Sequence, residues 1–484
     1  MLLTSAPMQV LETRRRGGRL ELLAALPASI RLERQRNFFR ATLDRGLRVN
    51  ARVQARADLE SIEGRLVDLS IGGCQVAIAL RAAAGLQVGT HLERLRLRFP
   101  NGEVFDASGT VRHLRCGDTD SEGLLGVAFA GDADFERKVW FYVREIEREM
   151  ARLDPHVSRY TAPSRLFEVD AAPAPAAATL QSAADSEPST LPMYDQALAV
   201  SRALSVQLIN LQAGSTLDAG VLLEQSRALV ALLEEDSQAL LYALACLEGQ
   251  APALIAHGLA VGVRLAYLEL SHRPRSQVEQ ITACALVHDF GKVLLPEALR
   301  LFEGSMSEEQ RQGVHAHVAL LRPRLDRMAF ESPLYDDVLL AINERLDGSG
   351  YPEGVDQSAL TPLARLAAVV DVIDAMGRPR SDRPAWRVLD IYRYAFNAGD
   401  RLDTACVNRY VKRFGFNPVG SLVAYSRGFH AFVMRLDERG VPWQVRVVRE
   451  HDREVDVVLC GEELDQLGKL EGGVSSPESE LTPW

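Results

Sequence analysis

The stretch LVHDFGK, residues 286–292, decides how the second half of the chain is interpreted. It places His288 and Asp289 side by side, with Lys292 one helical turn beyond the histidine. An imidazole and a carboxylate are suitable ligands for a divalent metal that activates water. Neighbouring helical residues face different ways, so one of the two ligands has to coordinate from the edge of the site. The pair alone is a weak signal, because most histidines are satisfied core or surface residues.

Further residues complete a candidate metal site when the sequence is followed outward from this stretch. His257 lies upstream and Asp371 downstream, and both are expected on other helices, as in metal sites at the core of helical bundles. His317 and the segment ERLDGSGYP, residues 344–352, lie between the two. The predicted ligands of one metal are His257, His288, Asp289 and Asp371.

The order of these segments resembles the HD-GYP family of cyclic di-GMP phosphodiesterases, a branch of the HD metal-dependent phosphohydrolases. The resemblance covers nearly all of residues 195–450. It implies that Asp289 bridges two metals, with His317 and two further histidines on the second ion. It also implies that Lys292 and Arg383 face the substrate phosphate. The loop that it places beside the substrate and a partner domain consists of Gly350, Tyr351 and Pro352.

The chain departs from the family pattern at the second metal. The family carries two adjacent histidines just before ERxDGSGYP, where this chain has Ile342 and Asn343. Family members with three metals carry a glutamate where this chain has Ala253. Ile342 offers no ligand atom and Asn343 only a weak carbonyl oxygen, so a second ion would keep only Asp289 and His317. The sequence therefore predicts a divalent metal (Mn, Fe or Mg), with one ion favoured over two.

Loss of the second metal leaves several interpretations of this site open. Two-metal catalysis clamps both the attacking and the leaving oxygen, so its loss should be severe, yet one metal can still activate a water. The site is then a weak or altered phosphohydrolase, an inert pocket that binds nucleotide, or a surface kept for protein interaction. The histidines and aspartates can also persist as buried polar scaffolding, because buried polar groups need partners whether or not they catalyse.

Two short motifs stand out near the N-terminus. Arg36 and Arg40 lie in RNFFR, and Asp68, Ser70 and Gly73 lie in DLSIGG, directly after a predicted strand. Guanidinium groups bind phosphates in a bidentate manner and stack on purines. A carboxylate can accept from guanine N–H groups, a hydroxyl can add a hydrogen bond, and a glycine lets the backbone approach closely. The alternative for the arginines is a solvated basic run, of which ETRRRGG nearby is an example.

Together these motifs resemble the arginine pair and the strand motif of the PilZ family of cyclic di-GMP receptors. The resemblance runs from about residue 34 to 148 and implies a small barrel with cyclic di-GMP as its ligand. The first 33 residues resemble the end of the extra barrel of flagellar-brake type PilZ receptors. Either that domain is reduced, or the true start of the protein lies upstream. The predicted ligand contacts are Arg36, Arg40, Asp68, Ser70 and Gly73.

The pattern of apolar residues predicts a multidomain chain. Residues 34–150 show β-branched alternation and a final amphipathic helix, which predicts a small all-β barrel. Residues 193–400 carry apolar residues at helical spacing, which predicts a mostly α-helical bundle. The other predicted segments are a barrel remnant at 1–33, a flexible Ala/Pro/Ser linker at 151–192, a C-terminal extension with short strands at 401–460, and a disordered tail at 461–484.

Composition limits the partners and the compartment. The chain has 484 residues and a net charge of −10, which argues against binding of long nucleic acid. Its six cysteines are scattered and form no CxxC pair, which is typical of reduced cytosolic thiols. No apolar run reaches the ~18 residues of a membrane span.

We therefore expect a bacterial, cytoplasmic protein of cyclic di-GMP signalling. One hypothesis is an enzyme that hydrolyses cyclic di-GMP, with Lys292 stabilising charge on the phosphate. The competing hypothesis is a non-catalytic effector that binds the dinucleotide and contacts a protein partner through the loop at residues 350–352. The missing histidines favour the effector, whereas the four retained ligands and the intact DGSGYP favour the enzyme.

Overall fold

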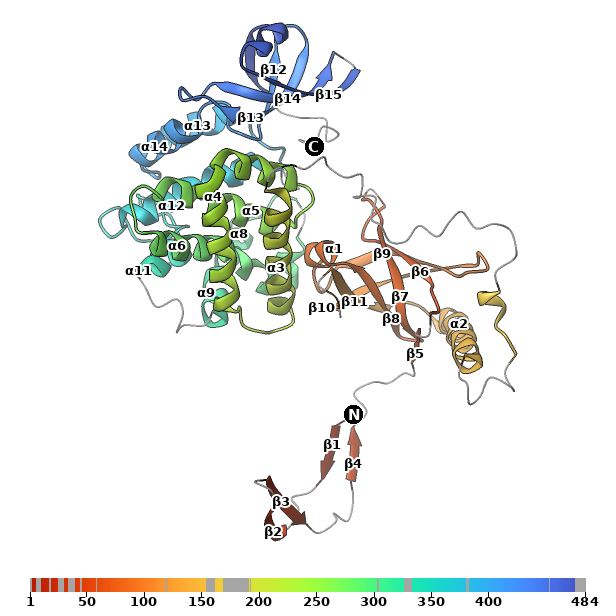
Figure 1. The fold of residues 1–484 in the computed structure, drawn as a ribbon. Helices are drawn as coiled ribbons and strands as arrows, with labels where there is room; N and C mark the ends of the chain where they lie inside the picture. The colour runs from red at the N-terminus through yellow and green to blue at the C-terminus, as the bar shows by residue number, and fades with distance from the viewer. Residues whose placement is uncertain are drawn as a thin grey trace.

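The structure is a computed structural model that describes most of the chain (Figure 1). It describes residues 40–474, except 44–45, 58, 118, 120, 154–161, 169–190, 192, 303, 326–332, 380–382 and 452. In the first 39 residues it describes only the backbone of four strands. These are β1 (Leu2–Ser5), which pairs with β4 (Ile30–Glu33), and β2 (Val10–Arg16), which pairs with β3 (Arg19–Ala24).

A closed antiparallel barrel follows. Its seven-stranded sheet runs in the order β5-β7-β6-β9-β10-β11-β8; the pairing between β7 and β8 closes six of these strands into the barrel, and β5 pairs with β7 outside the closed ring. The strands are β5 (Arg40–Thr42), β6 (Asn50–Gln54), β7 (Ile62–Ser70), β8 (Gly73–Ala79), β9 (His91–Arg98), β10 (Val104–Cys116) and β11 (Glu122–Phe129). Alternate residues such as Leu95, Leu97 and Phe105 are fully buried, as the alternation predicted. The predicted barrel is confirmed.

The helix α2 (Ala133–Arg152) covers the barrel, and a short part of the predicted linker packs against it. The helix begins where Asp132 accepts a hydrogen bond from the Phe135 N–H. Beyond it, Ser164 donates its hydroxyl to Glu145 at 2.8 Å, and the turn η2 (Arg165–Phe167) buries Leu166 in the barrel core. The linker prediction for residues 151–192 is therefore wrong for this turn, because Leu166 in SRLF is a large apolar residue that the barrel core buries.

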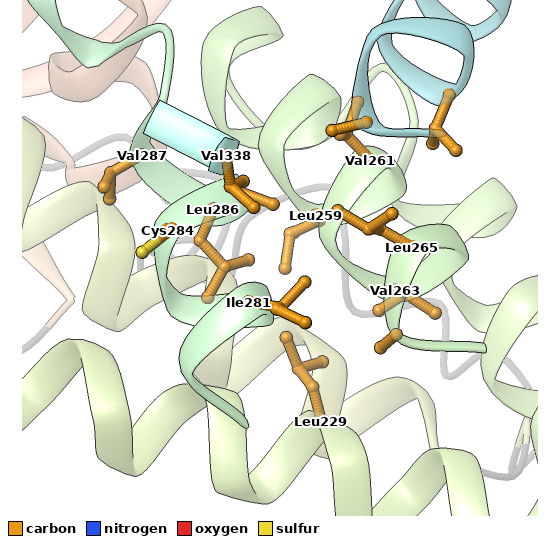
Figure 2. Close-up of a cluster of buried hydrophobic side chains, with 14 of the residues drawn as sticks. Leu229, Leu259, Val261, Val263, Leu265, Ile281, Cys284, Leu286, Val287 and Val338 are labelled. Atoms are coloured by element: carbon orange, nitrogen blue, oxygen red, sulfur yellow. The ribbon is translucent and has the colours of Figure 1, made fainter. Parts of the chain in front are cut away.

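The helical region is built around α4, α5 and α6. Figure 2 shows Leu229 of α4, Leu259 of α5 and Ile281 of α6 within one buried cluster. Within the described residues no helix is both long and apolar enough to cross a membrane. The helices and helical turns are α3 (Tyr194–Gln212), α4 (Ala219–Leu247), α5 (Ala253–Glu269), α6 (Arg275–Val287), η3 (Phe290–Leu294), α7 (Glu297–Arg300), α8 (Glu308–His315), α9 (His317–Leu321), η4 (Arg322–Arg324), α11 (Pro333–Tyr335), η5 (Asp336–Leu340), α12 (Pro362–Gly377), α13 (Val388–Asn397) and α14 (Thr404–Phe414).

A five-stranded antiparallel sheet ends the described chain. Its order is β15-β14-β13-β12-β16. The elements are β12 (Leu422–Tyr425), β13 (Phe429–Leu436), β14 (Pro442–Glu450), β15 (Arg453–Cys460), η6 (Gly461–Leu467) and β16 (Leu470–Gly473). The sheet is tied to α4 where Gln238 exchanges two hydrogen bonds with the main chain of Leu436. The disordered tail predicted from residue 461 is wrong up to residue 474, because Leu467 is buried in the core of this sheet.

The barrel packs on the helical region through one helix. The helix α1 (Leu80–Gly85) and strand β10 lie against α3, and Ile209 of α3 is fully buried in the barrel core. The other side of α3 lies against η3, the turn that follows the His288-Asp289 pair. In Figure 1, α3 stands between α1 and the remaining helices.

Candidate metal centre and nucleotide site

The His288-Asp289 pair lies where a helix ends. Helix α6 stops at Val287, and η3 begins after Asp289. The Nδ1 atom of His288 lies 2.8 Å from the carbonyl oxygen of Ala285, so it donates there and leaves Nε2 for another partner. Both residues keep right-handed helical backbone angles at this junction. The coordination of one of them from the edge of the site stays a prediction.

Two glycines let the ligand-bearing segments approach each other. A Cβ at Gly258, beside His257, would collide with the carbonyl oxygen of Leu286 on α6. A Cβ at Gly291 would collide with the carbonyl oxygen of His317 on α9. These close backbone contacts bring His257 and His317 to either side of the loop that carries Asp289.

The side chains of the predicted one-metal set converge in a buried pocket. The ligand atoms of His257, His288 and Asp289 lie within 4.8 Å of one another. Asp371 joins them from α12, because its Oδ1 lies 3.0 Å from Nε2 of His257 and 3.3 Å from Nε2 of His288. Nε2 of His317 lies 3.3 Å from Oδ1 of Asp289. All five predicted ligands are therefore brought together, with Asp289 between the two sides.

The donor set fits a divalent cation. Nε2 of His288 and Nε2 of His317 are buried, and each has a carboxylate oxygen at 3.3 Å but no well-formed hydrogen bond among the described residues. A metal ion bound between these nitrogens and carboxylates would give each of them a direct ligand bond. Imidazole nitrogens and carboxylate oxygens together suit Mn²⁺, Fe²⁺ and similar ions.

The second side of the pocket is poorer in donors. Ile342 is fully buried in the apolar core, and the buried amide nitrogen of the Asn343 side chain has no hydrogen-bond partner in the described part of the chain. Within the described part of the chain, His257, His288 and Asp289 form the only group of at least three His, Cys, Asp or Glu side chains with converging ligand atoms. The number of ions that the site holds stays a prediction.

The charges of the pocket oppose the cost of burial. Burial disfavours ionised Asp289, but the Lys292 ammonium that pairs with it and the nearby histidines hold its pKa well below the usual range. Burial alone would lower the pKa of His257, but its hydrogen bonds to Asp371 and Asp374 outweigh this effect and raise that pKa to about 9. In the metal-free protein at neutral pH, His257 is therefore protonated.

Metal affinity is expected to rise with pH. A metal that takes Nε2 of His257 must displace a proton, and this imidazole is protonated below its pKa of about 9. The apparent dissociation constant for Mn²⁺ should therefore fall by about tenfold per pH unit between pH 6 and pH 9 and level off above that. Isothermal titration calorimetry in buffers of different ionisation enthalpy measures both the affinity and the released proton. A pH-independent affinity would show that His257 is not a ligand.

The DGSGYP loop is held beside His317. Oε1 of Glu344 accepts the main-chain N–H groups of Glu353 and Gly354 at 2.8 and 3.1 Å. The Tyr351 ring stacks on His315 with centroids 3.7 Å apart and meets His317 edge-on at 5.9 Å. The sequence analysis did not single out His315, although HAH at residues 315–317 was a signal for it.

Arg383 and Lys292 occupy different surroundings. Lys292 pairs with Asp289 inside the pocket. The guanidinium of Arg383 donates to the carbonyl oxygens of Ala375 and Met376 at the end of α12. Arg383 thus closes the C-terminal turn of the helix that carries Asp371, and its contact with a phosphate stays a prediction.

Four of the five predicted nucleotide contacts in the barrel lie together. Nη1 of Arg40 donates to Asp68 at 2.8 Å, and strand β5 places Arg40 opposite Ser70 of β7. The Ser70 hydroxyl donates to the carbonyl oxygen of Gly73 at 2.9 Å. A Cβ at Gly73 would collide with the carbonyl oxygen of Val127, which explains the glycine without a ligand. Arg36 lies outside the described residues.

A group of residues behind the metal pocket was not predicted from the sequence. Asp374 accepts hydrogen bonds from His257, Arg264 and Arg378. The available signal was the D-x-x-D spacing of Asp371 and Asp374, which places two carboxylates one helical turn apart.

Comparison with known proteins agrees with this division of the chain. Residues 34–144 match the PilZ domain, and residues 246–398 match the HD domain. The chain therefore carries a PilZ domain and an HD domain.

Three known proteins illustrate these similarities. A cyclic di-GMP phosphodiesterase of Pseudomonas aeruginosa is 30% identical over 173 residues, which cover 36% of this chain and 42% of the relative. A cyclic di-GMP phosphodiesterase response regulator of Xanthomonas campestris pv. campestris is 31% identical over 141 residues, which cover 28% of this chain and 36% of the relative. The solved PilZ domain of YcgR from Escherichia coli with c-di-GMP is 20% identical, with a TM-score of 0.23, and the match covers 25% of this chain and 95% of that one. The chain spans about two fifths of the length of the curated relatives it matches.

Proposed function

We propose that this chain is a cyclic di-GMP signalling protein whose PilZ domain binds the dinucleotide and whose HD domain is a phosphodiesterase domain with a reduced metal site. The observation that carries the proposal is the buried convergence of His257, His288 and Asp289, with Asp371 against both histidines. The similarity to cyclic di-GMP phosphodiesterases supports the substrate class.

In the PilZ domain, Arg40 would leave Asp68 and bind a phosphate of the dinucleotide. In its ion pair with Asp68, 27% of the Arg40 side chain is accessible, whereas Asp68 is largely buried. A phosphate can replace the carboxylate at small cost only if Asp68 gains other donors in exchange. Asp68 is then free to accept from the N–H edge of a guanine, and Ser70 lies next to it on β7.

In the HD domain, His257, His288, Asp289 and Asp371 would hold one divalent metal. When bound, such a metal supplies a water of lowered pKa and polarises a phosphoryl oxygen. Lys292 lies at the rim of the pocket, with one third of its side chain exposed, and would neutralise charge on the phosphate. Tyr351 and His315 form a stacked pair beside the pocket that would bound the space for a base.

The alternative is a catalytically inactive effector whose HD domain contacts a protein partner through Gly350, Tyr351 and Pro352. The observation that favours it is the lack of a donor at Ile342, which is part of the apolar core. A turnover assay decides between the two. Full-length protein is incubated with cyclic di-GMP and Mn²⁺ or Fe²⁺ under reducing conditions, and products are resolved by chromatography. Linear dinucleotide or GMP is the expected result, and intact substrate with every metal would favour the effector.

Restoring a histidine is expected to add a second metal. The main-chain carbonyl oxygen of Asn343 accepts from the main-chain N–H of Tyr351 at 3.2 Å, and the Tyr351 ring lies against His317. Position 343 is therefore near that ligand. Because ligand-supporting residues alone are worth 10–100-fold in metal affinity, Asn343→His should raise affinity for a second ion at least about tenfold. Metal content after dialysis should change from one towards two per chain. The matched control is Asn408→His on the exposed face of α14, and an equal gain there would refute the assignment.

A further inference from the structure

We infer that Asp374 is a positioning residue of the metal centre, which fixes the orientation and tautomer of His257 and holds α5 in register with α12. This inference rests on the proposed function, because it requires that the HD domain binds a metal. Asp374 itself lies behind His257 and would not touch the ion.

The two ring nitrogens of His257 meet two carboxylates of the same helix. Nδ1 lies 2.7 Å from Oδ2 of Asp374, and Nε2 lies 3.0 Å from Oδ1 of Asp371. An ionised carboxylate can only accept, so Nδ1 carries a proton and donates it to Asp374. Nε2 is thereby the nitrogen that faces Asp371 and the pocket, and a metal would bind it in place of its proton. Histidine ligands in known metal sites are oriented by the same kind of contact from their second nitrogen.

Asp374 is kept ionised by the two arginines beside it. Oδ1 accepts from Nη1 of Arg264 at 2.6 Å, and Oδ2 accepts from Nε of Arg378 at 2.5 Å. Burial opposes ionisation, but Arg378, His257 and Arg264 hold the pKa of Asp374 well below its usual range. A buried carboxylate with three charged or polar donors is a rigid acceptor, which is what orientation of His257 requires.

The same cluster joins the two helices that carry metal ligands. Nη2 of Arg378 donates to the carbonyl oxygen of Ala256 at 3.1 Å, and Ala256 directly precedes His257. Arg264 lies two turns further along α5 and reaches the same carboxylate. Asp374 is therefore the point at which the last turn of α12 is fastened to α5. A shift of either helix would change the distance between Nε2 of His257 and Asp371.

The experiment compares metal binding by full-length wild-type protein, Asp374→Asn and Asp374→Glu. Asparagine can present an N–H to Nδ1 and lacks the charge that attracts the arginines, so the Mn²⁺ dissociation constant should rise about 10–100-fold. Glutamate keeps the charge, and a cavity of about 200 Å³ lined by Asp374, Arg264 and Arg378 gives room for the extra methylene. It should recover most of the affinity. The visible absorption of the Co²⁺ form, which reports ligand geometry, should change in Asp374→Asn and not in Asp374→Glu.

Controls keep the inference separable from folding and from the proposed function. Asp390→Asn removes a partly exposed carboxylate on α13 that also accepts from two arginines, and it should leave metal binding unchanged. If Asp374→Asn fails to fold, Arg378→Gln tests the inference in its place, and its affinity for Mn²⁺ should be at least about threefold lower than that of the wild type. Wild-type affinity and an unaltered Co²⁺ spectrum in the folded variant would overturn the role of Asp374 alone. A wild-type protein that binds no divalent metal would overturn the proposed metal site and this inference with it.

Discussion

Replacing Arg36 and Arg40 by alanine is expected to weaken cyclic di-GMP binding by the full chain by at least about 100-fold. Hydrogen bonds to charged groups contribute about 1.5–3 kcal/mol each, so loss of one bidentate phosphate contact alone removes a factor of this order. Arg40 would leave the buried Asp68, and guanine N–H groups would then donate to this carboxylate in its place, which offsets the contact that is broken. Calorimetric titration of the dinucleotide into wild-type and variant protein measures the change.

Arg96→Ala is the matched control for this experiment. Arg96 lies on β9 of the same barrel and forms a bidentate pair with Asp106, with distances of 2.8 and 2.9 Å. Its removal costs the barrel an equivalent ion pair without touching the predicted nucleotide contacts, so affinity should be unchanged. Arg40→Ala alone should account for a large part of the loss. If the double variant and the wild type bind cyclic di-GMP with equal affinity, the barrel is not a receptor that uses these arginines, regardless of the activity of the HD domain.

Residue patterns predicted most of the barrel and the metal ligands because both depend on local spacing. The alternation in ERLRLRF places Leu95 and Leu97 of strand β9 inside the barrel, with Arg94 and Arg98 outside, and a register shift opposite this strand lets Leu92 point inward as well. The five predicted metal ligands meet because each lies at the end or on the inner face of a helix whose apolar periodicity is visible in the sequence. Such features are fixed by neighbours within one turn or one strand.

Features that depend on contacts between distant segments could not be predicted in this way. The end of α6 before His288 accompanies close backbone contacts at Gly258 and Gly291, which join three separate segments. Asp374 looked like an ordinary helical aspartate until Arg264 and Arg378 were placed around it. Strand β16 was assigned to a tail because its pairing with β12 spans more than forty residues. In each case the deciding partner lies far away in the chain.

The double substitution His288→Ala with Asp289→Ala is expected to abolish tight divalent metal binding. It leaves His257 and Asp371 as the remaining members of the predicted one-metal set, and it removes the carboxylate that lies between them and His317. A ligand that binds only the folded state stabilises it by about 2.7 kcal/mol at one hundred times its dissociation constant. Wild-type protein should therefore melt at a higher temperature with Mn²⁺ than without, and the variant should show no such shift.

His272→Ala with Asp400→Ala is the matched control, because both side chains are exposed and lie outside the pocket. It should keep the full Mn²⁺-dependent shift. A shift that survives in His288→Ala with Asp289→Ala would place the metal elsewhere and contradict the proposed site. The same variant is also the control for the turnover assay. If the variant loses both product formation and the Mn²⁺-dependent rise in melting temperature, hydrolysis takes place at this site in spite of Ile342 and Asn343. A metal-dependent shift without any product would mean that the pocket holds its ion as part of a receptor, and that the loss of the second set of ligands ended catalysis and not metal binding.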